Sequence, residues 1–383
     1  MNRYILIFLL FIGSFVGKAQ NGIKGLQTEN QFKTSMDSMI HQSALLYLGE
    51  ASRAGLSVGI YGPDFLATYH YGTTHKGKNQ LPTNETVYEI GSISKTFTGT
   101  LLAQAVLDGK MKLDDDIRLY LKEDYPNLEF QGQPIRLSHL VSHISGLPNF
   151  LPDNPSLLQN TSQDSLPFVL SRVLNEYTKQ DFLNDLNQVK LDTIPGYKFN
   201  YSNSGPQLLK YILEDVYQMS FNDLLKRFLL KPLKMKATTS SFERVDLKNL
   251  AEGYNSKGRL TPYIPENLDA AGGIFSTVSD MLEYLKFHLD EENEVVSLSH
   301  QVTVGDLTRY AIGLNWQEVL TPGNHKKIWQ SGGTFGFSSY GVLYPELGIA
   351  IVLLTNEADT TAQTDLGHLA DRIFEKLYAP ENP

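Results

Sequence analysis

The chain has 383 residues and contains no cysteine. This absence excludes a disulfide-stapled scaffold, a thiol-dependent enzyme and a lipoprotein anchored through an N-terminal cysteine. Histidine occurs nine times but never in the H-E-x-x-H spacing, and the acidic run Asp114 to Asp116 lacks the glycine of a calcium loop. The sequence therefore predicts chemistry that needs no metal and no cofactor.

Long apolar runs are also scarce, and none reaches membrane-spanning length. The run Tyr4 to Val16 is too short to cross a bilayer; it follows Arg3 and precedes Gly17-Lys18-Ala19, small residues at the positions that a signal peptidase reads. We expect residues 1–19 to be a cleaved signal peptide and the mature protein to be periplasmic or secreted. A retained membrane anchor is the alternative.

Positive charge is in deficit, with 33 Lys and Arg against 42 Asp and Glu and a formal net charge of −9. Removal of Arg3 and Lys18 with the leader would change this to −11 (−9 minus 2). An acidic chain without a basic patch argues against nucleic acid as a partner. The remaining residues, 20–383, are enough for one large domain, and the sequence leaves the oligomeric state open.

Strand-like segments lie near both ends of the chain. Two of them, 56–61 and 65–71, flank a turn at Gly62-Pro63-Asp64, and four more follow in the last third, at 310–316, 327–332, 338–344 and 349–355. Helical periodicity is found at 31–51, 96–108, 137–141, 206–217, 221–230, 281–289 and 367–377. We expect an α/β (α+β) fold, with an antiparallel sheet from both chain ends flanked by helices and a mostly helical subdomain inserted at roughly 110–270.

The strongest chemical signal is Gly91-Ser92-Ile93-Ser94-Lys95 at the start of the predicted helix 96–108. Residues three apart at a helix start lie on one face, so the Lys95 amine can reach the Ser92 hydroxyl. Burial and the positive end of the helix dipole both favour a neutral lysine, which can then act as a base. The pattern predicts a lysine-activated serine nucleophile, and Ser92 N–H is a candidate oxyanion donor.

A competing serine, Ser57, lies in Gly55-Leu56-Ser57-Val58-Gly59, which matches the G-x-S-x-G pattern of the α/β-hydrolase elbow. That elbow needs a strand, a sharp turn and then a helix after the serine, whereas a hairpin follows here. An α/β-hydrolase esterase that uses Ser57 is therefore the less favoured alternative.

Two later segments can complete a site around Ser92. Tyr201 and Asn203 follow a Pro-Gly break; the tyrosine can take and return a proton, and the asparagine can orient a substrate. The segment Trp329 to Phe337 can supply a strand edge, with Gly333 N–H as a second oxyanion donor. Each of these two segments alone is a weak signal. His143, which lies beside Gly146 and Pro148, is interpreted as a residue that stabilises a turn.

Taken together, these segments resemble the serine β-lactamase and penicillin-binding protein family, in its class C β-lactamase-related branch with D-alanyl peptidases and esterases. The matches cover nearly all of the mature chain, in family order: Gly91 to Gly99, His143 to Pro148, Pro195 to Asn203, Ala271 to Ile274 and Gln330 to Phe337. A Y-x-N motif in second place, where class A enzymes have S-D-N, points to the class C branch.

The resemblance implies a role for each residue. Ser92 is the acylated nucleophile, Lys95 its base, and Tyr201 the group that protonates the leaving group and activates water. Asn203 holds the acyl side chain and Lys95. The segment Gln330, Ser331 and Gly332 lines the far wall, and Ser92 and Gly333 form the oxyanion hole.

One position departs from the family pattern, because neutral Gln330 stands where lysine or histidine is usual. Glutamine offers hydrogen bonds but no charge to a substrate carboxylate, although Asn356 could touch such a group. We therefore expect an exported serine hydrolase for D-amino-acid cell-wall peptides or small esters. The alternatives are a true β-lactamase and a non-catalytic or permanently acylated penicillin-binding sensor.

Overall fold

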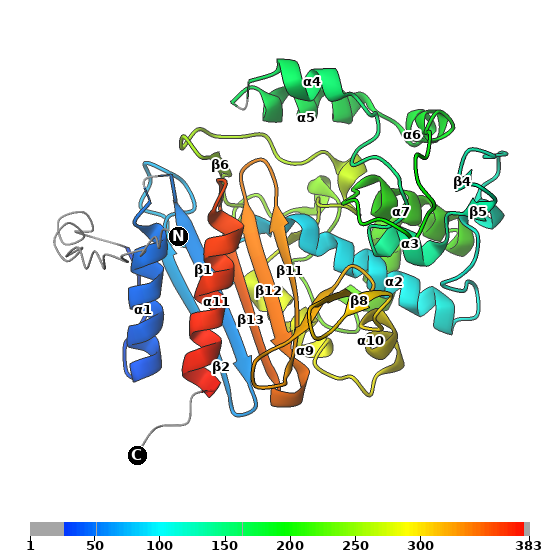
Figure 1. The fold of residues 1–383 in the computed structure, drawn as a ribbon. Helices are drawn as coiled ribbons and strands as arrows, with labels where there is room; N and C mark the ends of the chain where they lie inside the picture. The colour runs from blue at the N-terminus through cyan, green and yellow to red at the C-terminus, as the bar shows by residue number, and fades with distance from the viewer. Residues whose placement is uncertain (1–26, 51, 163, 379–383) are drawn as a thin grey trace, which may run out of the picture.

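The computed structural model describes residues 27–50, 52–162 and 164–378, so the predicted signal peptide lies outside the described residues. Its centre is an eight-stranded sheet in the order β2-β1-β13-β12-β11-β10-β9-β8 (Figure 1). Each neighbouring pair in it is antiparallel. The strands are β1 (Gly55–Gly62), β2 (Phe65–Gly72), β8 (Val304–Asp306), β9 (Tyr310–Ile312), β10 (Gln317–Leu320), β11 (Lys326–Gly333), β12 (Ser338–Tyr344) and β13 (Ile349–Thr355).

Both faces of the sheet are covered by helices, which explains why its central strands are buried throughout (Figure 1). Alternate residues of β13 point to opposite faces. Ile351 and Leu353 belong to the core under α1 (Ser35–Leu48) and α11 (Ala362–Tyr378), which pack side by side. Val352 and Leu354 belong to the larger core that includes α2 (Ser94–Leu107) and α9 (Val278–Phe287).

Helices are the main regular elements between α2 and α9, and long loops connect them. These helices are α3 (Leu137–Val141), α4 (Pro155–Asn160), α5 (Leu166–Glu176), α6 (Lys179–Leu186), α7 (Ser204–Tyr217) and α8 (Phe221–Leu225), and α10 (Glu294–Ser299) follows α9. Two short strand pairs join distant segments: β3 (Tyr88–Glu89) with β7 (Phe275–Ser276), and β6 (Tyr254–Asn255) with β14 (Glu357–Ala358). A third pair, β4 (Glu129–Phe130) with β5 (Gln133–Pro134), is local.

Helix α2 runs through the middle of the molecule, and a 3₁₀ turn, η1 (Gly91–Ile93), leads into it. Its apolar residues are buried, with Phe97 and Leu101 at most 2% exposed. The neighbouring face is buried as well: the hydroxyls of Thr96 and Thr100 lie 3.0 and 3.2 Å from the Tyr284 hydroxyl on α9. The two threonine hydroxyls are thus paired inside the core, and these contacts fix the N-terminal half of the helix against α9.

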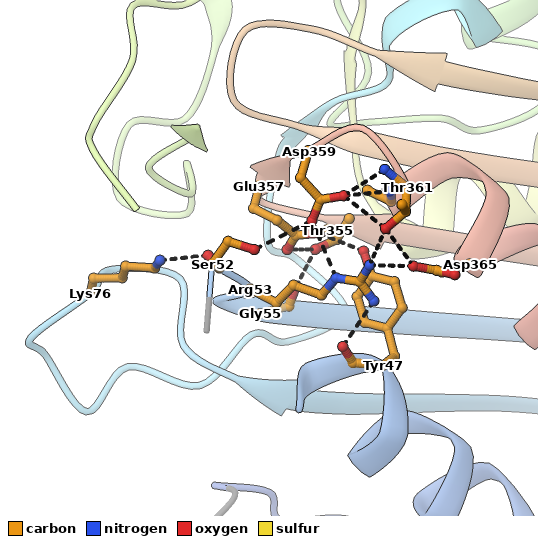
Figure 2. A network of polar contacts seen from close by, with 11 residues as sticks. Tyr47, Ser52, Arg53, Gly55, Lys76, Thr355, Glu357, Asp359, Thr361 and Asp365 are labelled. Atoms are coloured by element: carbon orange, nitrogen blue, oxygen red, sulfur yellow. Dashed lines mark hydrogen bonds and ion pairs between the residues drawn. The ribbon is translucent and has the colours of Figure 1, made fainter. Parts of the chain in front are cut away.

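The two chain ends are tied together by the buried guanidinium of Arg53 (Figure 2). Its nitrogens donate to the Tyr47 carbonyl (2.9 Å) and the Thr361 hydroxyl (3.1 Å), and they form ion pairs with Asp359 and Asp365. Beside it the fully buried Glu357 accepts from the Tyr47 hydroxyl at 2.5 Å. The network therefore connects α1, the start of β1, the end of β13 and the start of α11.

Two sequence predictions are corrected by the structure. The predicted strand 310–316 is in fact β9 followed by a turn, because Asn315 adopts a left-handed conformation (φ 65°) and β10 begins only at Gln317. The predicted helix 221–230 changes from α-helix to π-helix after Leu225. Helices α4 and α10 and strand β8 were not predicted. Within the ranges that the structure describes, no helix is long and apolar enough to cross a membrane.

Candidate active site

Ser92 lies on η1, and two proton-handling side chains meet its hydroxyl. The Lys95 amine donates to Ser92 Oγ at 3.0 Å from the first turn of α2. The Tyr201 hydroxyl donates to the same oxygen at 2.7 Å from the loop before α7. The structure thus brings Tyr201 to Ser92 and Lys95, although Tyr201 lies 109 positions after Ser92 in the sequence (201 minus 92).

Lys95 is fully buried, and its amine donates only to uncharged oxygens. Besides Ser92 Oγ, these are Asn203 Oδ1 at 2.7 Å and the Ala271 carbonyl at 2.5 Å. Burial lowers the pKa of Lys95 below its ordinary value, although the neighbouring Tyr201 opposes that effect. A lysine without a carboxylate partner in a dry site can give up its proton and serve as a base.

Tyr201 is positioned by His143, which accepts hydrogen bonds from the residues on both sides of the tyrosine. The His143 carbonyl accepts from Asn200 N–H at 2.7 Å, and its Nδ1 accepts from Ser202 N–H at 3.2 Å, so one residue holds both neighbours of Tyr201. The two rings lie 4.3 Å apart between centroids. Burial lowers the pKa of His143 to about 3, so the imidazole is neutral and acts as an acceptor here.

Asn203 connects the base to the opposite rim of the site. Its Oδ1 accepts from Lys95, and its amide nitrogen donates to Asn149 Oδ1 at 2.7 Å. Sequence reasoning missed Asn149 and the Ala271 carbonyl as partners in the site. Both lie in or next to segments that were recognised in the sequence. Asn149 directly follows the segment His143 to Pro148, and Ala271 is the first residue of the segment Ala271 to Ile274.

The far wall is the end of β11, which packs directly against η1. Gly91 has φ +53°, and a Cβ atom at this position would lie 2.4 Å from Gly333 N. A Cβ at Gly332 would lie 2.1 Å from the Ile90 carbonyl. Only glycine permits this approach. It brings the Gly333 amide next to the residue that precedes the nucleophile.

Gln330 lines the pocket but is held by other protein groups. Its side-chain amide donates to the Asn315 carbonyl at 2.8 Å, and its Oε1 accepts from Gln317 Nε2 (2.9 Å) and from Ser331 N–H (3.0 Å). Tyr310 donates in turn to Gln317 Oε1 at 3.0 Å. Gln330 is 5% exposed and forms an uncharged hydrogen-bonded row with Gln317 and Tyr310.

The cavity at Ser92 has a volume of about 460 Å³ and is lined by Tyr201, Asn203, Gln330, Ser331 and Gly333 among others. Neither Asp, Glu, Lys nor Arg is among the described residues that line it. The described part of the chain also contains no group of three or more His, Asp or Glu residues placed to hold a metal ion. The hollow is polar on one side but offers no formal charge to a ligand.

Two candidate residues lie elsewhere. Asn356 is fully buried at the sheet end, where its amide nitrogen donates to the carbonyls of Thr73, Thr74 and Glu252, and it does not line the cavity. Ser57 lies inside β1 with no exposed surface. Its hydroxyl is 3.0 Å from His70 Nδ1, and His70 Nε2 is 2.9 Å from Asn84 Oδ1. This row has the residue types of a serine triad, yet no substrate can reach it.

Comparison with known proteins agrees with this geometry. A family model described as Beta-lactamase matches residues 30–373. The chain belongs to the beta-lactamase family. The family resemblance of the sequence motifs is thereby confirmed.

Curated relatives and solved structures extend the comparison. Protein flp of Staphylococcus aureus (strain MRSA252) is 29% identical over 339 residues, which are 85% of this chain and 63% of that protein, so the chain spans less than two thirds of that relative. A Beta-lactamase of Pseudomonas fluorescens is 27% identical, over 79% of this chain and 88% of its own length.

The structural neighbours include a Beta-lactamase/D-alanine carboxypeptidase from Yersinia pestis, complexed with citrate (TM-score 0.73, 24% identity, 89% and 98% of the two chains). The protein of the same description from Pseudomonas syringae gives a TM-score of 0.74 at 22% identity, over 91% and 100% of the two chains. These likenesses confirm the predicted β-lactamase/transpeptidase-like fold.

Proposed function

We propose that this protein hydrolyses esters or amides through an acyl-enzyme on Ser92, and that its preferred substrates carry no carboxylate beside the scissile bond. The observation that carries the proposal is the uncharged cavity around a serine that both Lys95 and Tyr201 contact. Small esters fit this cavity better than the other class favoured by the sequence, D-amino-acid cell-wall peptides, because a peptide that ends in D-alanine carries a carboxylate.

In the acylation step Lys95 takes the Ser92 proton as Oγ attacks the carbonyl carbon. The N–H groups of Ser92 and Gly333 stabilise the resulting oxyanion. The carbon–oxygen or carbon–nitrogen bond then breaks, and Tyr201 delivers a proton to the leaving alcohol or amine. The phenolate of Tyr201 then takes a proton from a water molecule, whose oxygen attacks the Ser92 ester, and Lys95 returns its proton to Ser92 Oγ as the acid leaves. Asn203 keeps Lys95 in place during both steps.

The direct test is Ser92→Ala, with p-nitrophenyl acetate as the substrate. We expect turnover to fall at least a thousandfold and labelling by a fluorophosphonate to disappear, because no other described serine hydroxyl contacts both a lysine amine and a tyrosine hydroxyl. Ser57→Ala is the matched control and should retain activity. Ester hydrolysis that persists in the Ser92→Ala protein would refute the proposal. Mass spectrometry over time separates a transient adduct, expected of an enzyme, from the stable adduct of a permanently acylated sensor.

A second candidate is β-lactam or D-alanyl peptide hydrolysis, which is favoured by the names of the Pseudomonas fluorescens relative and of the two structural neighbours. The test is a panel of nitrocefin, p-nitrophenyl esters and D-alanyl peptides with wild type and Gln330→Lys. We expect the variant to gain about tenfold or more in kcat/KM on the carboxylate-bearing substrates alone, because it adds positive charge at the wall. High β-lactamase activity in the wild type would support this candidate over the first.

We also propose that the protein is exported, on the strength of the N-terminal segment Asn2 to Ala19. N-terminal sequencing of the protein recovered from its native compartment would test this, with Gln20 expected as the first residue.

A further inference from the structure

A second, apolar cavity adjoins the Ser92 cavity, and the proposed chemistry does not use it. We call it the α4–α5 cavity, because α4 and α5 form one wall through Leu157, Leu170, Val173 and Leu174. Its volume is about 170 Å³. Ile264, Leu268 and Phe335 also line it, and the segment Asn149 to Asn154, which includes Asp153, completes the lining. The cavity is therefore largely hydrophobic, with a few polar side chains at this segment.

The two cavities are neighbours, since Asn149, Phe150, Ile264 and Leu268 line both of them. Asn149 is at the same time the partner of Asn203, which holds Lys95. A chain that leaves the carbonyl carbon at Ser92 and passes Asn149 therefore enters the α4–α5 cavity. Isolated apolar cavities are common in proteins, but this one opens where a bound substrate would continue.

The direction of β11 indicates which part of a substrate points that way. Gln330, at one end of the wall, belongs to the hydrogen-bonded row with Gln317 and Tyr310. Gly333 comes three residues later, and Phe335, two residues further on, already lines the α4–α5 cavity. The oxyanion site thus lies between the polar row and the apolar cavity, so the two substituents of the carbonyl point to opposite ends.

We infer that the α4–α5 cavity binds the aliphatic acyl chain of an ester substrate, while the alcohol leaves past the Gln330 row. The inference rests on the proposed function and specifies its substrate class as medium-chain acyl esters. The bonds are those of the proposed mechanism: Ser92 Oγ forms the ester with the fatty acyl group, the bond to the alcohol breaks, and water releases the fatty acid.

The test is a series of p-nitrophenyl esters from acetate through butyrate and hexanoate to octanoate, in which only the acyl chain varies. Transfer of a methylene from water to an apolar site is favourable enough to raise kcat/KM by up to about fourfold per methylene once the chain reaches the cavity. We expect kcat/KM to rise along the series in the wild type. Val173→Trp, which fills the cavity, should lower octanoate turnover at least tenfold and change acetate turnover less than twofold.

Asn175→Trp is the matched control, because Asn175 lies on the same helix but is exposed and does not line the cavity. It should follow the wild-type profile. Leu170→Gln is a second variant that makes the wall polar without filling it, and it too should lower octanoate turnover selectively. Retained acetate turnover shows that each variant is folded.

The outcomes separate this inference from the proposed function. Absence of Ser92-dependent acetate turnover in the wild type would overturn both. Acetate turnover with a flat acyl-chain profile, or an unchanged profile in Val173→Trp and Leu170→Gln, would overturn the cavity assignment alone. A chain-length preference found only in a parallel series of alkyl acetates would also overturn it, since the cavity would then hold the alcohol.

Discussion

Burial favours the neutral form of three titratable residues around Ser92. Lys95 has only uncharged oxygen partners, and burial lowers its pKa, so its neutral form is within reach as a base. His143 is neutral and serves as a hydrogen-bond acceptor for the Tyr201 loop. Glu89, two residues before Gly91, is 1% exposed and accepts from Ile264 N–H at 2.5 Å. It thereby links the nucleophile segment to a residue that lines both cavities.

Glu89 gives a prediction for the pH dependence of stability. Burial raises its pKa from 4.5 to about 7. Between these two pH values the unfolded chain loses the proton while the folded protein keeps it, so stability falls as the pH rises through about 7. Glu89→Gln removes this loss, which amounts to about 3 kcal/mol above pH 7. Urea unfolding should show that the variant has a larger free energy of unfolding, relative to the wild type, at pH 8 than at pH 5.

The exposed Glu85→Gln is the control for this experiment, and its stability should follow the wild type at both pH values. An equal change in the free energy of unfolding at pH 5 and pH 8 for Glu89→Gln would show that Glu89 is ionised in the folded protein.

Among the elements, the contact between η1 and β11 sets the geometry of the oxyanion site. Gly91→Ala puts a side chain into a left-handed conformation and a Cβ atom 2.4 Å from Gly333 N. We expect a loss of stability of about 1–3 kcal/mol and a fall in kcat of at least a hundredfold, with the p-nitrophenyl acetate assay as the measurement.

Gly109→Ala provides the matched control. Gly109 also has a positive φ (+67°), but its added Cβ would meet nothing within 4 Å. This variant should lose stability of about 1 kcal/mol and keep its kcat. If Gly91→Ala proved as active as Gly109→Ala, the close approach of β11 to η1 would not be needed for catalysis.

The elements differed in how well the sequence predicted them. Strands β12 and β13 were predicted residue for residue, because turn residues bound each of them and β13 is an almost continuous apolar run. The segment 310–316 was predicted as one strand, although Gly313 and Asn315 inside it are turn formers, and Asn315 does turn the chain there. Ser92, Lys95, Tyr201 and Gln330 could be named from motifs. The partners of Gln330 could not, because the pairing of β9, β10 and β11 places them.

On the scale of the whole molecule, the Arg53 network connects the N-terminal and C-terminal segments by hydrogen bonds and ion pairs (Figure 2). The chain has no cysteine, so no disulfide can make this connection. Arg53→Met would leave Asp359, Asp365 and the Tyr47 carbonyl without their partner inside the protein. Removal of one partner of a buried ion pair typically costs about 3–5 kcal/mol. We expect a loss in that range by chemical denaturation, with the kinetics at Ser92 unchanged.

Arg118→Met is the comparison for this prediction. Arg118 forms ion pairs with Asp116 and Glu129, but its side chain is 28% exposed, and such pairs contribute about 1 kcal/mol or less. Equal losses for the two variants would mean that the position of Arg53 between the chain ends has no special effect.

The antiparallel pairing of β1 with β13 also has a consequence for the order of folding. Leu56 is the register partner of Thr355, so this pair closes a loop of 299 residues (355 minus 56). The N-terminal hairpin therefore cannot obtain its second neighbour until β13 has been synthesised. Until then the β1 edge lacks a partner, and such edges are sites of aggregation. Pairing over such long distances also slows folding. In a nascent chain, the edge of β1 is therefore protected only when β13 pairs with it.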